Sequence, residues 1–558
     1  MGLEDRAVRI LYATDVHGDR QNLKSLLEQS PADLCIIAGD LVRGPFRSNR
    51  SSFRFEELQR FFDFLKCRFR VDAPTKVFAE SRLLAPDAPA EEKRKAREYL
   101  RLYLRAHKTL MDEMAAFEEL FSGFPEKKIF VLPGNYDMDL KETALAGRDL
   151  HQRVVEIEGI RIAGYGGAEV RNLMAPEGLA VAFREVRREG RLESEPRDFL
   201  LRARPDIAVV HTPPFGYFDR LRNYGAMGSP GIREYLDAEA PAMLLCGHFH
   251  ENWGVLVKGR TVLVNPSHLG RLPDVMGVWR GGFCFEFLFE QGALSVGTIR
   301  QVERGRIYDV ADFIPEGKGR IRRLVIDPDR FATLSREGAP RGPGLRPILE
   351  FREVRDFFRR YETEETKKRI ADLRKIYRSL EKRGEEVAFD LLGSANFGMM
   401  EEGSDVDLVL YRRCPCDHAL PDRACSLPRL LGECFKSLEE RYRVEVTDCV
   451  NLNRVEESIR QQDPGCPALQ RFVLYRSICR PVNLRLIRKT ESLLSEHTNL
   501  KRKIEYEIRD YFKSMAFAPS NIYSFKKYQA RLNDQGVRLP PRILRKIDSY
   551  LRMPQAGR

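Results

Sequence analysis

The sequence lacks the features that mark membrane-spanning and secreted proteins. Among its 558 residues no apolar run approaches the roughly 18–20 residues that a bilayer span needs. The first residues, MGLEDRAVRILYATD, pass into a strand pattern without a basic and then apolar leader. We therefore expect a cytoplasmic protein with no membrane partner.

Cysteine is also scarce and does not suggest a disulfide framework. The chain has 11 scattered cysteines, an odd number that favours reduced thiols. One group, Cys414, Cys416, His418 and Cys425, could ligate zinc, but Cys-x-Cys-x-His is not a standard structural-zinc spacing. The alternative is a reduced, partly exposed loop.

Acidic residues are depleted at one end of the chain only. The net charge is +12, and residues 471–558 carry 20 Lys and Arg against 7 Asp and Glu, so the basic excess lies in this segment. A basic helical tail over 481–558 could contact phosphates of a nucleic acid, or could simply be a solvated helical face.

Polar motifs follow five short apolar runs. The runs Val8–Ala13, Asp33–Ala38, Lys128–Leu132, Ile207–Val210 and Met243–Cys246 lead into TDVHGD, GD, PGNYD, HTPP and GHFH. Buried strands in a layered α/β domain show this pattern, and ligands gather where the carboxyl ends of such strands meet.

The residues at these strand ends are all of metal-ligating types. A set of imidazoles, carboxylates and one amide suits Mn, Fe or Zn, and two cations about 3.5–4 Å apart can clamp a phosphate for in-line attack. The set consists of Asp15, His17, Asp40, Asn135, His211, His248 and His250.

The five motifs occur in the order seen in calcineurin-like metallophosphoesterases, which the sequence resembles over about residues 6–300. It is most similar there to predicted bacterial and archaeal phosphoesterases, through HTPPFGYFDR and LLCGHFHE. The resemblance implies a four-layer αββα sandwich. It also implies that one metal is held by Asp15, His17 and His250, that the other is held by Asn135, His211 and His248, and that Asp40 bridges them.

Tyr136 departs from this family pattern, because many members have His in the GNH motif where this chain has GNYD. A phenol of pKa about 10 donates a hydrogen bond at neutral pH but shuttles protons poorly compared with imidazole. We hypothesise that Tyr136 is a catalytic-site residue favouring phosphodiesters or other esters with good leaving groups. The alternative is that it packs against the helical insertion.

The remaining organisation follows from periodicity and composition. Residues 45–126 show helical spacing and predict an insertion into the first domain, which we place at 1–300. A linker is expected over 301–350, with the best candidate at Arg336–Pro347. A small α+β domain over 351–480 and the tail over 481–558 complete the chain.

The second domain contains FDLLGSANFGMMEEGSDVDLVLY. Gly393 and Ser394 end an apolar run and open a helix whose backbone could cradle a triphosphate. Asp405 and Asp407 lie on one face of a strand, as Mg²⁺ ligands do. The third carboxylate comes from RVEVTDCV: Glu445 fits better, and Asp448 is the alternative.

This pattern resembles the minimal nucleotidyltransferases of the DNA-polymerase-β superfamily over about residues 385–480. Two departures are Phe397, where many members have Arg, and Glu rather than Asp as third carboxylate. The resemblance implies Mg-dependent transfer from an NTP, with Asp405, Asp407 and Glu445 as catalytic residues.

Together the two halves predict a bifunctional enzyme. The first hydrolyses a phosphoester, expected to be nucleotide-related, and the second transfers a nucleotidyl group to a protein or nucleic-acid acceptor. The alternative is a phosphoesterase regulated by a catalytically inactive, nucleotide-binding second domain.

Overall fold

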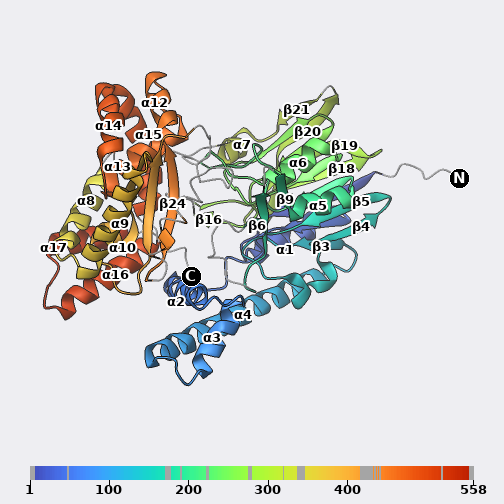
Figure 1. Ribbon diagram of the computed structural model, residues 1–558. Helices are drawn as coiled ribbons and strands as arrows, with labels where there is room; N and C mark the ends of the chain where they lie inside the picture. Colours follow the sequence, from blue (N-terminus) through green and yellow to red (C-terminus); the bar gives the residue numbers. More distant parts are fainter. Residues whose placement is uncertain are drawn as a thin grey trace. The chain divides into compact units, whose positions relative to one another are not determined.

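The computed structural model is a mixed α/β chain that divides into two compact units (Figure 1). The first unit is Met1–Phe62, Ala73–Leu221 and Ala226–Gly338; the second is Asp63–Asp72, Arg222–Gly225 and Ala339–Arg558. The structure describes residues 7–46, 49–169, 178–188, 191–221, 225–273, 279–317, 319–335, 346–414, 432, 435–436, 438, 441–516 and 519–551.

A seven-stranded sheet forms one layer of the first unit. Its order is β21-β20-β19-β18-β1-β2-β3, and β1, β2 and β3 are parallel. Their polar motifs therefore end at one edge. The strands are β1 (Val8–Thr14), β2 (Leu34–Ala38), β3 (Lys128–Leu132), β18 (Phe283–Glu290), β19 (Ala293–Glu303), β20 (Arg306–Gly317) and β21 (Arg320–Val325).

A six-stranded sheet forms the next layer, in the order β14-β15-β13-β10-β5-β4. Strands β5, β10, β13 and β15 are parallel to one another, so the HTPP and GHFH motifs also follow carboxyl ends of neighbouring strands. The strands are β4 (Arg153–Ile157), β5 (Ile160–Tyr165), β10 (Ile207–Val210), β13 (Met243–Leu245), β14 (Gly254–Lys258) and β15 (Thr261–Asn265).

Alternating side chains join the layers. Tyr12 and Ile36 of the first sheet share a core with Val209 and Leu245 of the second. The intervening residues of the second sheet, such as Leu244, face a different core that includes helices α5 (Glu195–Ala203) and α6 (Pro230–Ala238). Helix α1 (Arg20–Gln29) packs against β19 and β20, and α4 (Ala90–Ser122) packs against α1. The unit is thus layered helix, sheet, sheet, helix.

Three helices occupy the segment in which the sequence predicts a helical insertion: α2 (Asn49–Phe69), α3 (Thr75–Leu84) and α4. Helices α3 and α4 pack against each other. Phe55 of α2 stacks on Tyr99 of α4 with ring centroids 5.0 Å apart. These aromatic contacts give the insertion a small core of its own.

The expected linker over 301–350 is wrong for much of its length, because β20 and β21 extend the first sheet there. Val310, Ala311 and Phe313 of β20 are buried in the sheet core. The missed signal is Arg304-Gly305, which takes positive φ at both residues, as a tight hairpin turn requires. Helix α7 (Pro328–Ser335) follows, and 336–345 of the linker candidate lie outside the described residues.

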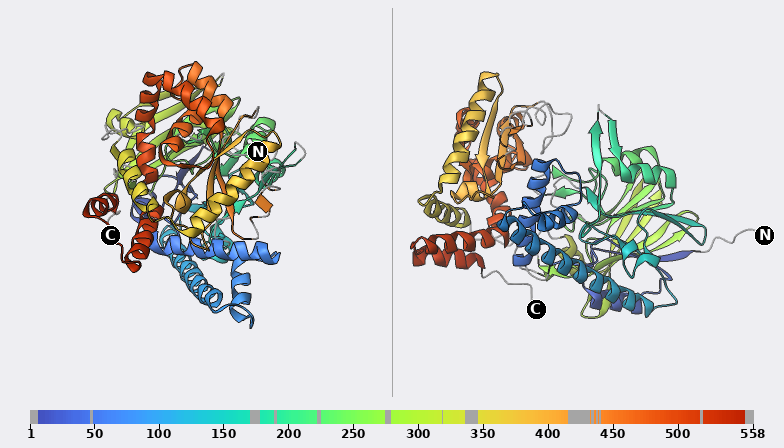
Figure 2. Two further views of the ribbon diagram at one scale, coloured as in Figure 1. Left: turned by 60° about the vertical axis from the view of Figure 1, so that its left-hand side comes forward. Right: turned by 60° about the horizontal axis from the view of Figure 1, so that its bottom comes forward.

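The second unit is a four-stranded sheet covered by helices (Figure 2). Its strand order is β24-β23-β22-β25, with β23 and β24 parallel and β22 antiparallel to β23. The elements are β22 (Val387–Leu391), β23 (Val406–Arg412), β24 (Val444–Asn451), β25 (Arg480–Pro481), α8 (Arg346–Arg359), α9 (Glu364–Lys382), α10 (Gly393–Phe397), α12 (Leu452–Arg460), α13 (Pro467–Ile478), α14 (Arg485–Glu496), α15 (Thr498–Ala516), α16 (Pro519–Asp534) and α17 (Pro541–Leu551).

The basic C-terminal helices share the core of this sheet. Ile487, Ile504, Phe525 and Ile547 lie in the same buried cluster as Val409 of β23. The boundary expected at 480/481 therefore does not coincide with a break in the core. The expected tail is basic on its exposed faces and apolar where it packs.

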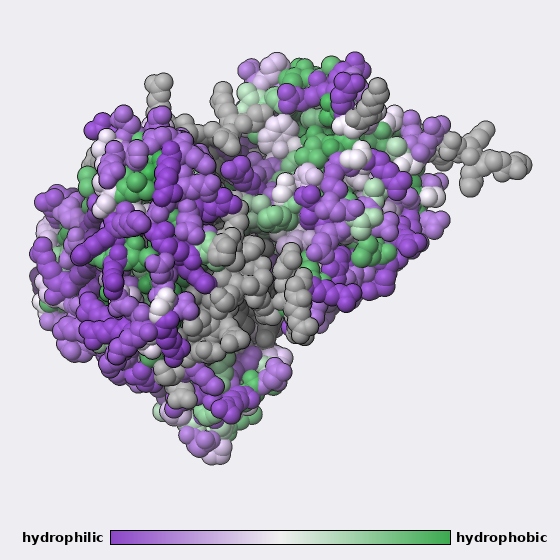
Figure 3. Space-filling view, turned by 45° about the horizontal axis from the view of Figure 1, so that its top comes forward, coloured by the Kyte–Doolittle hydropathy of each residue, from purple (hydrophilic) through white to green (hydrophobic). Residues whose placement is uncertain are grey.

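Short elements complete the described residues. They are β6 (Ala168–Glu169), β7 (Ala182–Phe183), β8 (Glu185–Arg188), β9 (Arg191–Ser194), β11 (Arg220–Leu221), β12 (Gly225–Ala226), β16 (Leu272–Pro273), β17 (Trp279–Arg280) and the 3₁₀ helices Leu140–Glu142 and Ala146–Arg148. Among the residues described, none of the helices is both long and apolar enough to cross a bilayer. On the face drawn in Figure 3, hydrophilic side chains predominate, with apolar residues in small groups between them.

Candidate metal centres

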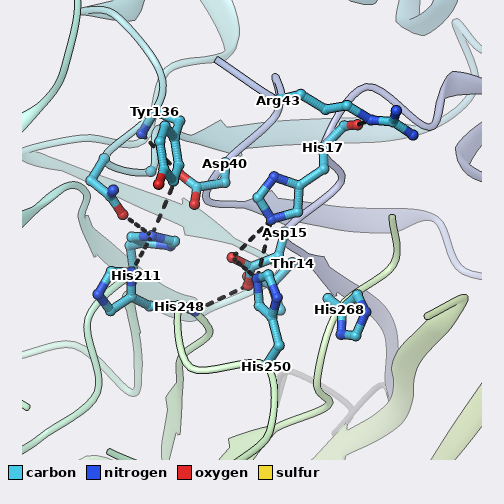
Figure 4. Close-up of polar contacts among 12 residues, drawn as sticks. Thr14, Asp15, His17, Asp40, Arg43, Tyr136, His211, His248, His250 and His268 are labelled. Atoms are coloured by element: carbon cyan, nitrogen blue, oxygen red, sulfur yellow. Dashed lines mark hydrogen bonds and ion pairs between the residues drawn. The ribbon is translucent and has the colours of Figure 1, made fainter. Parts of the chain in front are cut away.

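The structure brings the strand-end residues of the first unit together in two groups (Figure 4). Asp15, His17 and His250 form one group, and Asp40, His211 and His248 form the other; within each, one ligand atom per residue lies within 4.8 Å of the others. Asn135 joins the second group, because its Oδ1 lies 3.0 Å from Nε2 of His211.

The first group has three potential ligand atoms close to one another. Nε2 of His17 lies 3.1 Å from Nε2 of His250, which lies 3.3 Å from Oδ1 of Asp15. The remaining separation, His17 Nε2 to Asp15 Oδ1, is 3.9 Å. Metal–ligand bonds of about 2.0–2.2 Å place neighbouring ligands roughly 3.0–3.5 Å apart. The three atoms are therefore spaced like ligands around one cation.

The second group has the same spacing. Nε2 of His211 lies 3.2 Å from Nδ1 of His248 and 3.7 Å from Oδ1 of Asp40. Both groups combine imidazole nitrogen with carboxylate oxygen and contain no thiolate, a donor set suited to Zn, Mn or Fe. The residues present thus fit two divalent cations.

The protonation states favour cation binding. Burial lowers the pKa of His211 to about 3 and those of His17 and His248 to about 4, so these imidazoles are neutral at pH 7. Burial raises the pKa of Asp15, but its hydrogen bond and ion pair with His250 outweigh burial and leave this pKa below its ordinary value. Burial lowers the pKa of His250, but the same contact with Asp15 outweighs it and leaves the pKa of His250 raised. Neutral imidazoles and an ionised carboxylate are the forms that bind metal.

Asp40 shows the electrostatic cost of gathering buried carboxylates in the site. Burial, followed by the charges of Asp15 and Asp137, raises the pKa of Asp40 well above its ordinary value. Buried carboxylates so close together repel each other, and a divalent cation between them would remove that repulsion.

The backbone of the site is held in an unfavourable conformation. Asp15, His17, Asp40 and His248 all have positive φ, between 37° and 70°, although none is glycine. Such residues cost of order 1–3 kcal/mol each and persist only where the surrounding structure fixes them. Gly134 allows the close approach involved, because a Cβ there would lie 2.0 Å from the backbone nitrogen of Asp40.

Asp137 supports the ligand loops from behind. Its buried carboxylate accepts hydrogen bonds from the backbone N–H groups of Gly134 (2.8 Å), Leu41 (3.0 Å) and Val42 (3.1 Å). It therefore ties the loop that carries Asp40 to the loop that carries Asn135.

Tyr136 lies at the edge of the site with 48% of its residue surface exposed. Its backbone N–H donates to Oδ1 of Asp40 at 2.9 Å, and its ring meets that of His17 edge-on with centroids 6.4 Å apart. Burial of the hydroxyl, then the charge of Asp40, raises the pKa of Tyr136, so the phenol keeps its proton at neutral pH.

Sequence reasoning missed two neighbours of the first group. Thr14 donates a 2.7 Å hydrogen bond from its hydroxyl to Oδ2 of Asp15. His268 stacks on His250 with ring centroids 4.5 Å apart. The available signal was the NPSH motif at 265–268, which begins at the last residue of β15, where a strand ends as at the other motifs.

The second unit contains a separate acidic group, formed by Asp405, Asp407 and Glu445, each half-buried. One oxygen from each lies within 4.8 Å of the others. Asp407 and Glu445 are opposite each other in the parallel register of β23 and β24. Gly393 approaches closely, since a Cβ there would lie 2.3 Å from Oδ2 of Asp407.

The alternative third carboxylate, Asp448, lies elsewhere. It is fully buried, accepts a hydrogen bond from the Tyr475 hydroxyl at 2.8 Å and pairs with Arg471 at 3.0 Å. In the register of β23 and β24 it pairs with Val409 and not with Asp407. Of the two candidates, only Glu445 is in the acidic group.

Two other positions singled out in the sequence, Ser394 and Phe397, make ordinary helix and core contacts. Ser394 belongs to α10, a helix of only five residues, and its carbonyl accepts from the Met399 N–H at 2.9 Å. Phe397 is buried against Phe351, Phe525 and Tyr528, with ring centroids 5.1–5.8 Å apart. Of the proposed zinc cluster, Cys414 is buried, and Cys416, His418 and Cys425 lie outside the described residues.

Comparison with known proteins gives distant likenesses to the chain. No family model matches it. It is 23% identical over 181 residues to the UPF0046 protein K07C11.7 of Caenorhabditis elegans; the match covers 29% of this chain and 58% of that protein, so the chain spans little more than half the length of this curated relative.

Solved structures resemble the chain only distantly. A conserved uncharacterized protein and predicted phosphoesterase from Streptococcus pneumoniae shares 13% identity at a TM-score of 0.22, with 55% of this chain and 98% of that chain covered. Vacuolar protein sorting 29 from Cryptosporidium parvum shares 8% identity at a TM-score of 0.25, and the match covers 57% of this chain and 100% of that chain. Purple acid phosphatase PPD1 from yellow lupin shares 9% identity at a TM-score of 0.24, and the match covers 61% of this chain and 58% of that chain. At these TM-scores the likenesses carry no conclusion about function.

Proposed function

We propose that the first unit is a metal-dependent phosphoesterase that uses two divalent cations. The observation that carries the proposal is the pair of facing ligand groups, Asp15–His17–His250 and Asp40–His211–His248, at the carboxyl ends of parallel strands. When bound, the cations would supply Lewis acidity and lower the pKa of water.

The residues of the site would have separate roles in holding the cations and the phosphoester. Asp15, His17 and His250 would hold one cation, Asn135, His211 and His248 would hold the other, and Asp40 would be shared between them. Tyr136 keeps its proton and offers a hydrogen bond to the phosphoester rather than a ready proton transfer. This supports a phosphodiester or nucleotide-related substrate with a good leaving group.

A substrate panel tests this function. The full chain loaded with Mn²⁺, Fe²⁺ or Zn²⁺ is assayed with bis(4-nitrophenyl) phosphate, 4-nitrophenyl phosphate and cyclic nucleotides. We expect metal-dependent hydrolysis that prefers diesters. Two bound cations per chain without hydrolysis of any phosphoester would contradict the proposal.

A second function is favoured by the acidic group of the second unit. We propose that Asp405, Asp407 and Glu445 bind Mg²⁺ and catalyse nucleotidyl transfer from an NTP to a protein or nucleic-acid acceptor. Oxygen-only ligands suit Mg²⁺. Pyrophosphate release from an NTP, measured with each of the four ribonucleotides, supports transfer. Saturable NTP binding without pyrophosphate would instead support a regulatory, inactive domain.

The basic helices suggest a nucleic-acid partner for the second unit. Lys501, Arg502 and Lys503 are consecutive and exposed on α15. Removing 481–558 would open the core, so a charge-reversed variant of these three residues is the better test. We expect salt-sensitive RNA binding in the parent that weakens in the variant at equal thermal stability.

A further inference from the structure

His268 contributes a flat surface to the first metal centre although it is not one of the ligands. Its ring lies nearly parallel to that of His250, with an interplanar angle of 23° and centroids 4.5 Å apart. His268 is 7% exposed, and its side chain also bonds to the Ser267 hydroxyl and to the backbone of Arg280, so packing and hydrogen bonds together set its position. Figure 4 shows the ring beside His250, on the side away from His17.

The loop that carries His268 also hydrogen-bonds to the backbone next to and at His250. The Ser267 hydroxyl donates to the His250 carbonyl at 2.7 Å and lies 2.9 Å from Nδ1 of His268. The Asn265 side chain donates to the Phe249 carbonyl at 3.3 Å. Ser267 has φ +77°, a conformation that tertiary contacts must maintain.

The loop also reaches the other ligand segment of this centre. The backbone N–H groups of Leu269 and Gly270 donate to the carbonyls of Thr14 and Asp15, both at 2.9 Å. Residues 265–270, here called the clamp segment, therefore bond to the segments that carry Asp15 and His250. These two ligands come from different sheets, so a connection between them fixes their separation.

His250 has a particular need for such support. Its side chain is 24% exposed, against 7% for His17 and 0% for Asp15. The torsion that rotates an imidazole about its Cβ–Cγ bond has broad minima, so rotamer preference does not fix the ring plane. His17 gains a hydrogen bond to the Val42 carbonyl. His250 contacts Asp15 through Nε2 at 3.3 Å, and the face of His268 packs against its ring.

We propose that His268 is a positioning residue for the Asp15–His17–His250 centre, acting through the face of its ring to hold the His250 imidazole in the orientation that binds metal. The inference rests on the proposed metal centres and does not depend on which phosphoester is hydrolysed. It predicts an effect on one centre of the two.

Mn²⁺ binding by the full chain tests this, with calorimetry for affinity and electron paramagnetic resonance for coupling between paired ions. Two variants separate the roles of the ring: His268→Ala removes the face, and His268→Phe keeps the face without the nitrogens. We expect His268→Ala to weaken one of the two Mn²⁺ sites about 10- to 100-fold and to replace the coupled signal by that of single ions. His268→Phe should stay within about threefold of the parent.

The control is His151→Phe, at another buried histidine of the same unit that meets Tyr165 edge-on, with ring centroids 5.0 Å apart. This variant should lose stability yet keep both Mn²⁺ affinities. Equal binding of two Mn²⁺ by His268→Ala would overturn the inference, as would a loss in His268→Phe as large as that in His268→Ala. A parent that binds two Mn²⁺ but hydrolyses nothing would contradict only the proposed phosphoesterase.

Discussion

The two units present metal-ligand groups of opposite character. In the first, four of the six grouped residues are buried, His248 and His250 are half-buried, and several of the residues take positive φ. In the second, three carboxylates are half-buried and lie on regular strands and their ends. Buried mixed donors hold borderline cations tightly, whereas partly open oxygen sites suit a hydrated Mg²⁺ that leaves with its nucleotide. The comparison suggests one resident metal site and one exchangeable site in the same chain.

The largest expected effect is a loss of hydrolysis without a loss of nucleotidyl transfer, caused by a substitution in the first site. Asp40→Asn removes the charge that would bridge the cations, and we expect phosphoester hydrolysis to fall by at least about a hundredfold. Nucleotidyl transfer should be unchanged. Parallel assays on one preparation measure both, and unchanged hydrolysis would remove Asp40 from the site.

Substitutions in the second site should have the opposite result, abolishing nucleotidyl transfer and leaving hydrolysis intact. Asp405→Asn combined with Asp407→Asn removes two of three Mg²⁺ ligands, so transfer of labelled nucleotide should become undetectable while hydrolysis persists. Glu402→Gln, at an exposed carboxylate in the loop that precedes these aspartates, is the matched control and should transfer normally. Persistent transfer in the double variant would exclude a role for this group.

Chelation should distinguish the metals by how firmly they are held. After brief treatment with EDTA and gel filtration, we expect Zn, Mn or Fe to remain with the first unit and Mg²⁺ to be lost from the second. Elemental analysis and the two assays report the outcome. Equal loss of both activities would show that burial of the first site does not retard metal release.

A smaller change is expected from Tyr136→His. An imidazole transfers protons near neutral pH far better than a phenol, so hydrolysis of esters with poor leaving groups should rise about tenfold relative to 4-nitrophenyl esters. Tyr136→Phe keeps the ring and should not show this shift. An unchanged preference in Tyr136→His would mean that the tyrosine does not set leaving-group selectivity.

The smallest effect concerns stability rather than activity. Burial raises the pKa of Asp149 in the first unit to about 6 from an ordinary value of 3.8. Its protonation therefore stabilises the fold below about pH 4, and this contribution is lost as the pH rises through 6. Asp149→Asn should raise stability by on the order of 1 kcal/mol at pH 8 and by nothing at pH 4. Thermal unfolding across this pH range measures it; a gain that is independent of pH would point to another cause.

Most of the first site could be predicted because each ligand lies at the end of an apolar run. Those runs place Asp15, Asp40 and His211 by strand geometry alone. His268 could not be found this way, because its role depends on a stacking contact with His250 rather than on a ligand type. The hairpin at Arg304-Gly305 was missed because Gly, Arg and Asp suggest a linker when strand pairing is unknown.

In the second unit, strand alternation predicted the pairing of Asp405 with Asp407. The local strand pattern also favoured Glu445 over Asp448, and the structure places Glu445 in the acidic group. The register shift that pairs Asp448 with Val409 could not be read from the sequence. The C-terminal helices were expected to be a separate tail because their charge is conspicuous in the sequence, while the apolar residues that join the core are widely spaced.

The order of strands in the seven-stranded sheet has a consequence for biosynthesis. Val8 of β1 pairs with Phe289 of β18, so one edge of β1 has no ladder partner until the chain 281 residues further on has been synthesised. Pairings between such distant segments form slowly. Nascent chains should therefore carry an unpaired strand for much of translation, and chaperones that shield such edges should raise the yield of folded protein.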